Sequence, residues 1–485
     1  MWDTVGGGDF MSLHNDISRI LERDLYPFHM PGHKRNPAFD SMNGLFARDL
    51  TEIDGADDLH CPQGIILEAQ KRAAALYGAH EAYFLVNGST AGLLTAVSAA
   101  TQAGGKIIVA RNCHKAVYNA VFLRNLTPVY VYPAFDEDFG INGSVFPEEI
   151  EKAIAANPEA QAVILTSPTY DGVVSDIKRI AEIVHEHKMI LIVDAAHGAH
   201  HGMHPAFPDS AVHLGADAVI VSLHKTLPSP TGTAMLLLNG DRVNPNRVRR
   251  FLDVYETSSP SYLFMSAMDA CIGLLTQQKE SLFSALHQKL LHFSEAVRNL
   301  QAVRVFCFGS DEVGNHPDVF AHDMSRIVLK AEKLPMNGFE LEEILCQRFG
   351  IEAEMSFADC SVLLTSICDT QEGFDRLVKA LLTLDAENRD NIAVKRSIHA
   401  PPVPQQVFTP AQAELRDGCM ILLNDAQDRI CREYVCAYPP GTPLLVPGER
   451  ITAGVLSYIR SVLYCGAKVT GSSGKMPAYI DVCTE

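Results

Sequence analysis

The sequence predicts an α/β fold in which helices cover a mostly parallel sheet of seven strands. Between about residues 82 and 240, short runs rich in Val, Ile and Leu alternate with helical or turn segments, and Gly, Pro, Asn or Asp bound the runs. This alternation is typical of a parallel sheet that is buried on both faces. The predicted strands are Tyr83–Val86, Lys106–Ala110, Pro128–Val131, Ala162–Leu165, Ile190–Val193, Ala218–Val221 and Ala234–Leu238.

Smaller units are expected after this sheet. The stretch from Tyr262 to about Leu300 contains long segments free of Gly and Pro, which favours a helix that bridges to a second region. A smaller α+β region then extends to about Leu384, and the proline-rich segment Ala400–Pro404 indicates a linker. The expected units are an N-terminal segment (1–25), a large domain (26–265), a bridging helix with a small α+β domain (266–400) and a C-terminal domain (401–485).

Composition narrows the class of protein. The 485 residues are 47% hydrophobic and 20% charged, which is ordinary globular usage. A net charge of -18 disfavours nucleic acid as a partner, and no run approaches the ~20 apolar residues of a membrane span. The twelve cysteines include no C-x-x-C pair, so neither a zinc ribbon nor a disulfide scaffold is expected, and a reducing cytoplasm is the predicted location.

A lysine and an aspartate stand at the ends of two predicted strands. Ser222-Leu223-His224-Lys225 follows one apolar run, and Asp194 ends another, thirty-one positions earlier. Taken alone, such a lysine is usually solvated and such an aspartate is often a helix N-cap. Together they indicate pyridoxal phosphate (PLP), because a crowded lysine forms a Schiff base and a carboxylate keeps the pyridine nitrogen protonated.

A phosphate site and a stacking residue are also expected. Asn87-Gly88-Ser89-Thr90 combines a tight glycine turn, two hydroxyls and a helix start, although ordinary helix starts share this pattern. Ser222 supplies a further hydroxyl that can reach the phosphate. His114 follows the run Lys106–Ala110 and either lies flat against the pyridine ring or is a partly buried structural histidine.

Ten segments together match the pattern of a known family. They are Phe28–Lys34, Asp54–His60, Asn87–Thr90, Cys113–Lys115, Ser167–Gly172, Asp194–Gly198, Ser222–Thr226, Thr257–Tyr262, Tyr438–Gly441 and Pro447–Glu449. On these segments the chain, from about Tyr26 onward, resembles the bacterial ornithine/lysine/arginine decarboxylases, in the short form without an N-terminal wing domain. This resemblance implies an aspartate-aminotransferase-like fold (type I), with PLP bound in the large domain. The chain departs from the family pattern at Ala195 and Ala116, neither of which is expected to take part in the principal chemistry.

The resemblance assigns roles residue by residue. Lys225 would hold the cofactor, Asp194 would pair with the pyridine nitrogen, His114 would stack on the ring and His197 would lie near its phenolic oxygen. The phosphate end would be held by Ser89, Thr90, Ser222 and His224. Thr257 or Ser258 would reach the active site of the neighbouring subunit in a homodimer or higher homo-oligomer. Lys225 or His224 would return a proton to the substrate's α-carbon.

The expected activity is decarboxylation of arginine, lysine or ornithine to the corresponding amine (agmatine, cadaverine or putrescine) and CO2, in polyamine biosynthesis. The substrate's distal cation needs an acidic partner, for which Glu354 and Asp57 are candidates, each also explicable as a structural residue. Three alternatives remain: another type I PLP reaction such as transamination or a lyase step, a zinc enzyme built on the histidines of His197–His204, and a non-catalytic binding protein. No metal is expected, because glycines break the helical spacing of those histidines.

Overall fold

The structure is a computed structural model that describes most of the chain. The described residues are 12–22, 44–306, 313, 315–358, 360–392, 400–438 and 442–484. Two of the family segments, Phe28–Lys34 and most of Tyr438–Gly441, lie outside the described residues.

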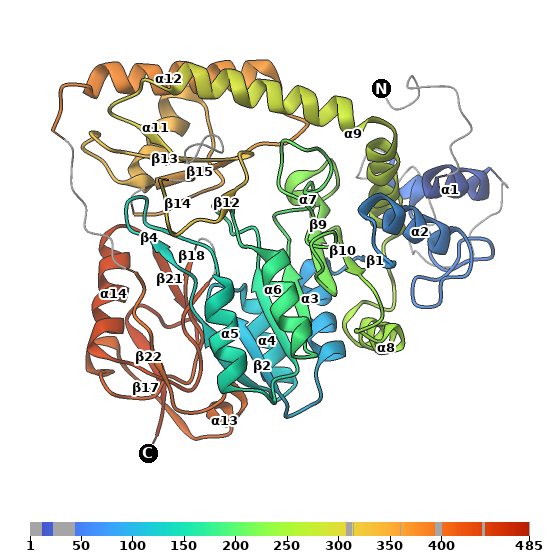
Figure 1. The fold of residues 1–485 in the computed structure, drawn as a ribbon, viewed down its shortest axis with the longest axis horizontal. Helices are drawn as coiled ribbons and strands as arrows, with labels where there is room; N and C mark the ends of the chain where they lie inside the picture. Colours follow the sequence, from blue (N-terminus) through green and yellow to red (C-terminus); the bar gives the residue numbers. More distant parts are fainter. Residues whose placement is uncertain are drawn as a thin grey trace.

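A sheet of seven strands forms the centre of the fold, in the order β1-β10-β9-β8-β6-β2-β3 (Figure 1). The expectation of a mostly parallel sheet is confirmed: only β10 runs antiparallel to its neighbours, and the other strands share one direction. Each strand lies within two residues of its predicted bounds. The strands are β1 (Glu81–Leu85), β2 (Lys106–Ala110), β3 (Thr127–Val131), β6 (Ala162–Thr166), β8 (Ile190–Asp194), β9 (Ala218–Ser222) and β10 (Ala234–Leu238).

Helices cover the sheet. Every residue of β9 and β10 is buried, and because alternate residues of a strand point to opposite faces, both faces must be covered there. α3 packs along β8, β9 and β10, whereas α6 packs against β8 and α5. The helices of this part are α2 (Ile65–Tyr77), α3 (Gly88–Ala100), α4 (Lys115–Leu123), α5 (Pro147–Ala156), α6 (Ile177–Glu186), α7 (Leu223–Thr226) and α8 (Pro245–Tyr255).

The expected bridging helix is present as α9 (Tyr262–Val297), which spans 36 residues. It begins where the side chain of Ser261 accepts a hydrogen bond from the backbone N–H of Phe264, as an N-cap does. Its first half packs on α1 (Leu13–Leu21) and α2, and its second half lies along α12 (Gln371–Asn388) (Figure 1). The helix therefore connects the large sheet with the region that follows it.

A second sheet of four strands, in the order β11-β13-β15-β14, packs under α9, α11 and α12. Strand β12 leaves this region and pairs with β7 beside the large sheet. The elements are β7 (Val173–Val174), β11 (Arg304–Val305), β12 (Ala321–His322), β13 (Arg326–Lys330), α11 (Gly338–Phe349), β14 (Met355–Ser356) and β15 (Cys360–Leu364). A hairpin of β4 (Phe135–Asp136) and β5 (Ile141–Asn142) lies nearby.

The C-terminal part has an apolar core of its own, built around residues such as Val435, Ile459 and Ile480. Its elements are β16 (Gln405–Gln406), α13 (Pro410–Glu414), β17 (Gly418–Leu422), β18 (Val435–Tyr438), β19 (Pro443–Leu445), β20 (Glu449–Arg450), α14 (Ala453–Tyr464), β21 (Lys468–Gly471) and β22 (Tyr479–Cys483). The expected domain boundaries at 25/26, 265/266 and 400/401 stay predictions.

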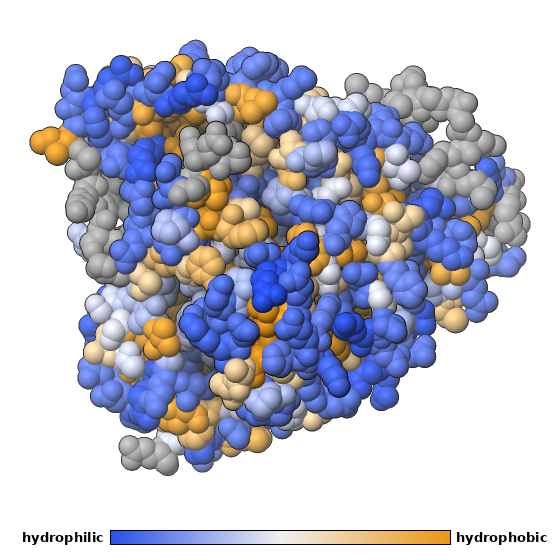
Figure 2. Space-filling model, viewed as in Figure 1, coloured by the Kyte–Doolittle hydropathy of each residue, from blue (hydrophilic) through white to orange (hydrophobic). Residues whose placement is uncertain are grey.

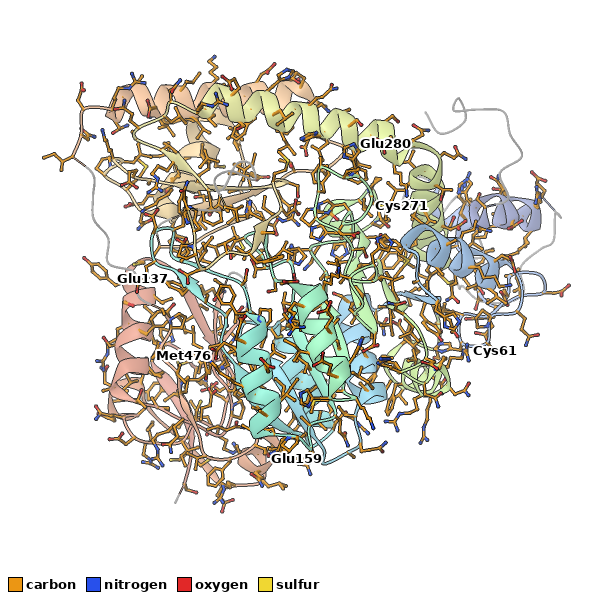
Figure 3. All side chains as sticks on the ribbon, in the orientation of Figure 1. Cys61, Glu137, Glu159, Cys271, Glu280 and Met476 are labelled. Carbon is orange, nitrogen blue, oxygen red and sulfur yellow. The ribbon has the colours of Figure 1, made fainter. Side chains whose placement is uncertain are left out.

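The surface is mainly hydrophilic on the face drawn in Figure 2, where hydrophobic residues form small separate patches. The described cysteines are free thiols, among them Cys61 and Cys271, which lie apart in Figure 3. Within the described residues, no helix is both long and apolar enough to cross a membrane.

Candidate active site

Lys225 lies at the carboxyl end of β9, on the short helix α7. Its Nζ is 2.9 Å from Nε2 of His197 and 5.5 Å from the ring centroid of Tyr170. Burial lowers the pKa of the Lys225 amine, although the carboxylates of Asp194 and Glu354 oppose that shift. The amine is therefore easier to deprotonate than a lysine in water, as Schiff-base formation requires.

Asp194 ends β8, which is the parallel neighbour of β9, so the sheet brings it to the same edge as Lys225. The carboxylate is 2% exposed and its Oδ1 accepts the backbone N–H of Ala196. Burial raises the pKa of Asp194, and the nearby Lys225 amine opposes this shift. A buried carboxylate of this kind is poised to pair with a cationic group of a ligand.

Two imidazoles flank Lys225. Burial lowers the pKa of His197 well below its ordinary value and lowers that of His114 to about 4, with Lys225 adding to both shifts. His197 packs on Tyr170 with ring centroids 4.0 Å apart. His114 caps α4, since its Nδ1 accepts the backbone N–H of Ala116. Both rings are neutral near pH 7, so they offer flat surfaces without adding charge.

The segment predicted to bind the phosphate, or phosphate cradle, lies at the start of α3, and its role stays a prediction. Gly88 begins α3 with a φ of 74°, and Ser89 is half-buried while Thr90 is exposed at the start of this helix. The Oγ of Ser222 is fully buried and has no hydrogen-bond partner among the described residues. A buried hydroxyl without a protein partner fits a role in binding a ligand oxygen.

Glu256 is a part of this cradle that the sequence did not reveal. Its Oε2 accepts the backbone N–H groups of Val86 and Asn87, which directly precede α3. Its Oε1 is buried and has no partner among the described residues. Burial raises the pKa of Glu256 to about 7. No sequence motif indicates this role, because Glu256 lies about 170 residues after the turn whose backbone it binds.

The other expected site residues lie at different distances from the centre. His224 is next to Lys225 in the chain, and its Nδ1 is 3.1 Å from the carbonyl oxygen of Thr233. Thr257 and Ser258 lie on a turn after α8, where the carbonyl of Thr257 accepts a hydrogen bond from His60. No contact within the described residues joins Thr257 or Ser258 to the Lys225 cluster.

Arg326 is a second residue that sequence reasoning missed. Its side chain is fully buried, and it donates hydrogen bonds to the carbonyl of His197 (2.8 Å) and to the hydroxyl of Ser325 (3.0 Å). The guanidinium thereby ties β13, from the four-stranded sheet, to the loop that carries Asp194 and His197. Its charge also contributes to the lowered pKa of Lys225, after the larger effect of burial.

The histidine-rich segment forms a hydrogen-bonded network. His200 and His201 place their Nε2 atoms 3.0 and 3.2 Å from Oδ2 of Asp323, and all three side chains are buried. These groups are close enough to share a metal ion. Each imidazole, however, already uses Nε2 on the same oxygen. Burial lowers the pKa of His200, Asp323 opposes that shift, and the positive charge of Arg326 adds a smaller lowering effect. The absence of a metal stays a prediction.

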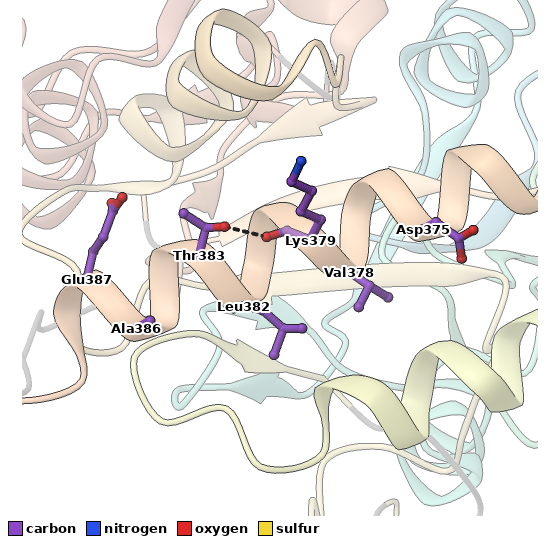
Figure 4. A pocket seen from close by; sticks show the side chains of 7 residues that line it. All are labelled: Asp375, Val378, Lys379, Leu382, Thr383, Ala386 and Glu387. Atoms are coloured by element: carbon purple, nitrogen blue, oxygen red, sulfur yellow. Dashed lines mark hydrogen bonds between the residues drawn. The ribbon is translucent and has the colours of Figure 1, made fainter.

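Two further features lie outside the cluster. Asp57, a candidate for the substrate's distal cation, instead accepts the backbone N–H groups of Gly64 and Ile66 at the start of α2. The negative charge of Asp57 thus stabilises the N-terminus of α2. A hollow on α12, drawn in Figure 4, is lined by that helix alone and contains no residue of the Lys225 cluster.

Comparisons with known proteins identify the family of this chain. The model of the Orn/Lys/Arg decarboxylase major domain matches residues 13–342, and the model of the family's C-terminal domain matches residues 393–474. The chain belongs to the Orn/Lys/Arg decarboxylase family. It is 32% identical to an arginine decarboxylase of Bacillus subtilis, with 95% of each chain covered. It is 22% identical to the constitutive lysine decarboxylase of Escherichia coli, over 88% of this chain and 73% of that protein.

Solved structures place the fold of this decarboxylase among the type I PLP enzymes. The structure of E. coli constitutive lysine decarboxylase superposes with a TM-score of 0.81 at 19% identity, covering 97% of this chain and 82% of that one. A ureidoglycine–glyoxylate aminotransferase from B. subtilis superposes with a TM-score of 0.54 at 16% identity, over 69% of this chain and 88% of that one. The expected aspartate-aminotransferase-like fold is confirmed.

Family membership makes the protein a PLP-dependent decarboxylase of basic amino acids. The described residues fit this cofactor. The buried carboxylate of Asp194 is suited to pair with a cationic nitrogen, the pKa of the half-buried Lys225 is lowered, and the buried hydroxyl of Ser222 has no hydrogen-bond partner among the described residues. The alternatives of a zinc enzyme and a non-catalytic protein are thereby disfavoured.

Proposed function

We propose that this decarboxylase converts arginine to agmatine and CO2. The support is a difference in sequence identity between two groups of relatives. The arginine decarboxylases are 30–32% identical to this chain over most of its length, whereas the lysine decarboxylases are 22% identical. The observation that carries the chemistry is Lys225, which is half-buried, lies within hydrogen-bonding distance of His197 and is close enough to Asp194 for that carboxylate to act on its pKa. A role in polyamine biosynthesis follows from the amine product.

We assign the cofactor-binding roles as follows. Lys225 Nζ bonds the cofactor covalently, Asp194 keeps a proton on its pyridine nitrogen, and His114 and His197 pack around the ring as neutral imidazoles. Ser222, together with the N-terminus of α3 at Ser89 and Thr90, binds the phosphate, with His224 beside it. These assignments rest on the burial, charge and unpaired polar atoms described above.

Bound PLP supplies an electron sink for the electron pair that departing CO2 leaves behind. The chain must then exclude water and return a proton to the α-carbon. Lys225 Nζ and the ring of His224 are the proposed proton donors, because both leave β9 at the same point. The carbonyl of Thr233 accepts the proton on His224 Nδ1 and fixes the ring, so a proton delivered by His224 would have to come from Nε2 of a doubly protonated ring.

Assembly and location are also proposals. Thr257 and Ser258 lie on an exposed turn, and we propose that they reach the phosphate of a second copy, so that each active site is completed in a homodimer. Free thiols throughout the described part of the chain fit a reducing compartment, so we propose a cytoplasmic location.

The first experiment combines a visible absorbance spectrum with CO2 release. Wild-type protein reconstituted with PLP should show the long-wavelength band of a lysine-bound cofactor and should release CO2 from arginine faster than from lysine or ornithine. Lys225→Ala should lose both band and turnover, while Lys178→Ala, an exposed lysine on α6, should keep them. Keto-acid formation in place of CO2 would favour transamination, and a wild-type spectrum without the band would overturn the cofactor assignment.

A further inference from the structure

The turn that leads into α3 is held by one buried carboxyl group. Oε2 of Glu256 accepts the backbone N–H groups of Val86 (3.2 Å) and Asn87 (3.0 Å), and Gly88 follows them with a φ of 74°. The side chain comes from the segment after α8 and is 8% exposed. Glu256 therefore fixes the backbone directly before Ser89, where the predicted phosphate cradle begins.

The second oxygen of this carboxyl group has no use within the described part of the chain. Oε1 of Glu256 is buried there without a hydrogen-bond partner. A buried polar atom that lacks a partner costs free energy, and such atoms are rare in folded proteins. A residue that only had to hold the turn would not need a buried second oxygen. The free oxygen therefore favours a role for the carboxyl group beyond that of a brace.

The surroundings of Glu256 leave its charge finely balanced. Burial raises the pKa of this group to about 7, while the amides of Asn87 and Val86 and the side chain of His60 oppose that shift. His60 in turn lies 3.7 Å from Asp253, whose side chain is 77% exposed. Near neutral pH the carboxyl group is therefore divided between its neutral and its ionised form.

A phosphate bound at the start of α3 would respond to that charge. The presence of a phosphate here rests on the proposed function. Such a group carries a charge of roughly −2 near neutral pH. An ionised carboxylate beside the same turn repels it, and the repulsion is stronger in a buried setting than in water. A neutral carboxyl group holds the turn without this repulsion.

We propose that Glu256 is a positioning residue that couples the binding of the cofactor's phosphate to the uptake of a proton from solvent. As a neutral acid it braces the turn and admits the phosphate, and as a carboxylate it weakens phosphate binding. In the competing explanation Glu256 is a brace alone. Glu256→Gln separates the two roles, because the side-chain oxygen of glutamine accepts the same two N–H groups but carries no charge at any pH.

The experiment compares PLP with pyridoxal, which has the same ring and aldehyde but no phosphate. Dissociation constants for the cofactor-free protein are measured by titration of the long-wavelength band, between about pH 6.5 and about pH 8.5. The ratio of the two constants cancels the titration of the ring and of Lys225. In the wild type, the preference for PLP should fall roughly tenfold across this range. In Glu256→Gln the preference should stay constant.

The matched control is Asp253→Asn, which removes an exposed carboxylate from α8 and should keep the pH dependence of the wild type. A second measurement needs no variant. In weakly buffered solution at about pH 7.5, binding of PLP to the wild type should take up more protons than binding of pyridoxal, by up to about one proton per chain.

Three results would overturn the coupling. They are a wild-type preference for PLP that does not change with pH, a Glu256→Gln preference that falls as steeply as that of the wild type, and equal proton uptake with the two compounds. Failure of the proposed function has a different signature. There the wild type forms no long-wavelength band with either compound, and the cofactor assignment falls together with the coupling.

Discussion

Burial, more than any single neighbour, sets the protonation of the groups around Lys225. It lowers the pKa of the lysine and of both flanking histidines, and it raises that of Asp194. The two imidazoles are therefore neutral, and the charge of the site is concentrated in the lysine and carboxylate. A cofactor with a cationic ring nitrogen suits the carboxylate of this distribution.

Glu256, beneath the phosphate cradle, should give the protein a distinct pH dependence. Burial raises its pKa from 4.5 to about 7, so between these values the folded chain holds a proton that the unfolded chain has released. The resulting stability is fully present below pH 4.5 and is lost as pH rises through about 7. In Glu256→Gln, the decrease in the free energy of unfolding across this range should shrink by up to about 3 kcal/mol.

The measurement is urea unfolding of the cofactor-free protein at several pH values. Glu137→Gln, which removes an exposed carboxylate labelled in Figure 3, is the control and should leave the pH profile of the wild type. A Glu256→Gln profile that parallels the wild type would contradict the assignment of this dependence to Glu256.

At the scale of elements, the parallel strands bring the reactive side chains together at one edge of the sheet. Because β8 and β9 run side by side in the same direction, their carboxyl ends deliver Asp194 and Ser222–Lys225 to one edge. The loop after β6 adds Tyr170 from the next strand along the sheet. This loop turns at Gly172, whose φ of 92° lies in the left-handed region.

Gly172 also permits the close approach of Arg326. A Cβ at this position would lie 2.7 Å from Cβ of Arg326 and 2.9 Å from Nε2 of His322. Gly172→Ala should therefore lower the free energy of unfolding by roughly 2–4 kcal/mol, through backbone strain and overpacking together. Urea unfolding measures the loss.

Gly104→Ala separates these two causes. Gly104 has a φ of 75° and open space where its Cβ would stand, so it reports backbone strain alone, about 1–2 kcal/mol. If both variants lost the same stability, packing against Arg326 would not be what requires glycine at position 172.

At the scale of the whole molecule, the C-terminal part is fastened to the large sheet through Arg111. Its guanidinium bonds Oε2 of Glu449 at 3.0 Å and the carbonyl of Pro443 at 2.6 Å, and the side chains are buried. Tyr118 and Tyr130 enclose the cation, with ring centroids 5.5 and 5.4 Å from it. The same stretch of chain continues to His114, so this fastening also supports the active site.

Removing one partner of the Arg111–Glu449 pair should strongly lower the free energy of unfolding. Glu449→Gln leaves the Arg111 charge buried without its counter-ion, and we expect a loss of about 3–5 kcal/mol in the free energy of unfolding. Glu387→Gln, which breaks the exposed pair with Arg348, should change the free energy of unfolding very little, because water and salt screen that pair. Thermal unfolding of both variants checks the contrast; similar losses would show that the Arg111 pair does not fasten the two parts.

The sequence predicted the elements better than it predicted the site around them. Buried strands and the helix from Tyr262 were visible because continuous apolar runs and long stretches without Gly or Pro are local signals. Lys225 and Asp194 were found because each directly follows such a run. Arg326 and Glu256 were missed, since each acts on backbone groups more than 100 residues away and no local pattern records that contact.

The bond from Arg326 to the carbonyl of His197 has a mechanical consequence. Together with the pairing of β12 and β7, it clamps the four-stranded sheet to the edge that carries Lys225. Swinging that sheet outward would break both connections at once. The two layers are therefore expected to move as one rigid block, without a hinge opening between them.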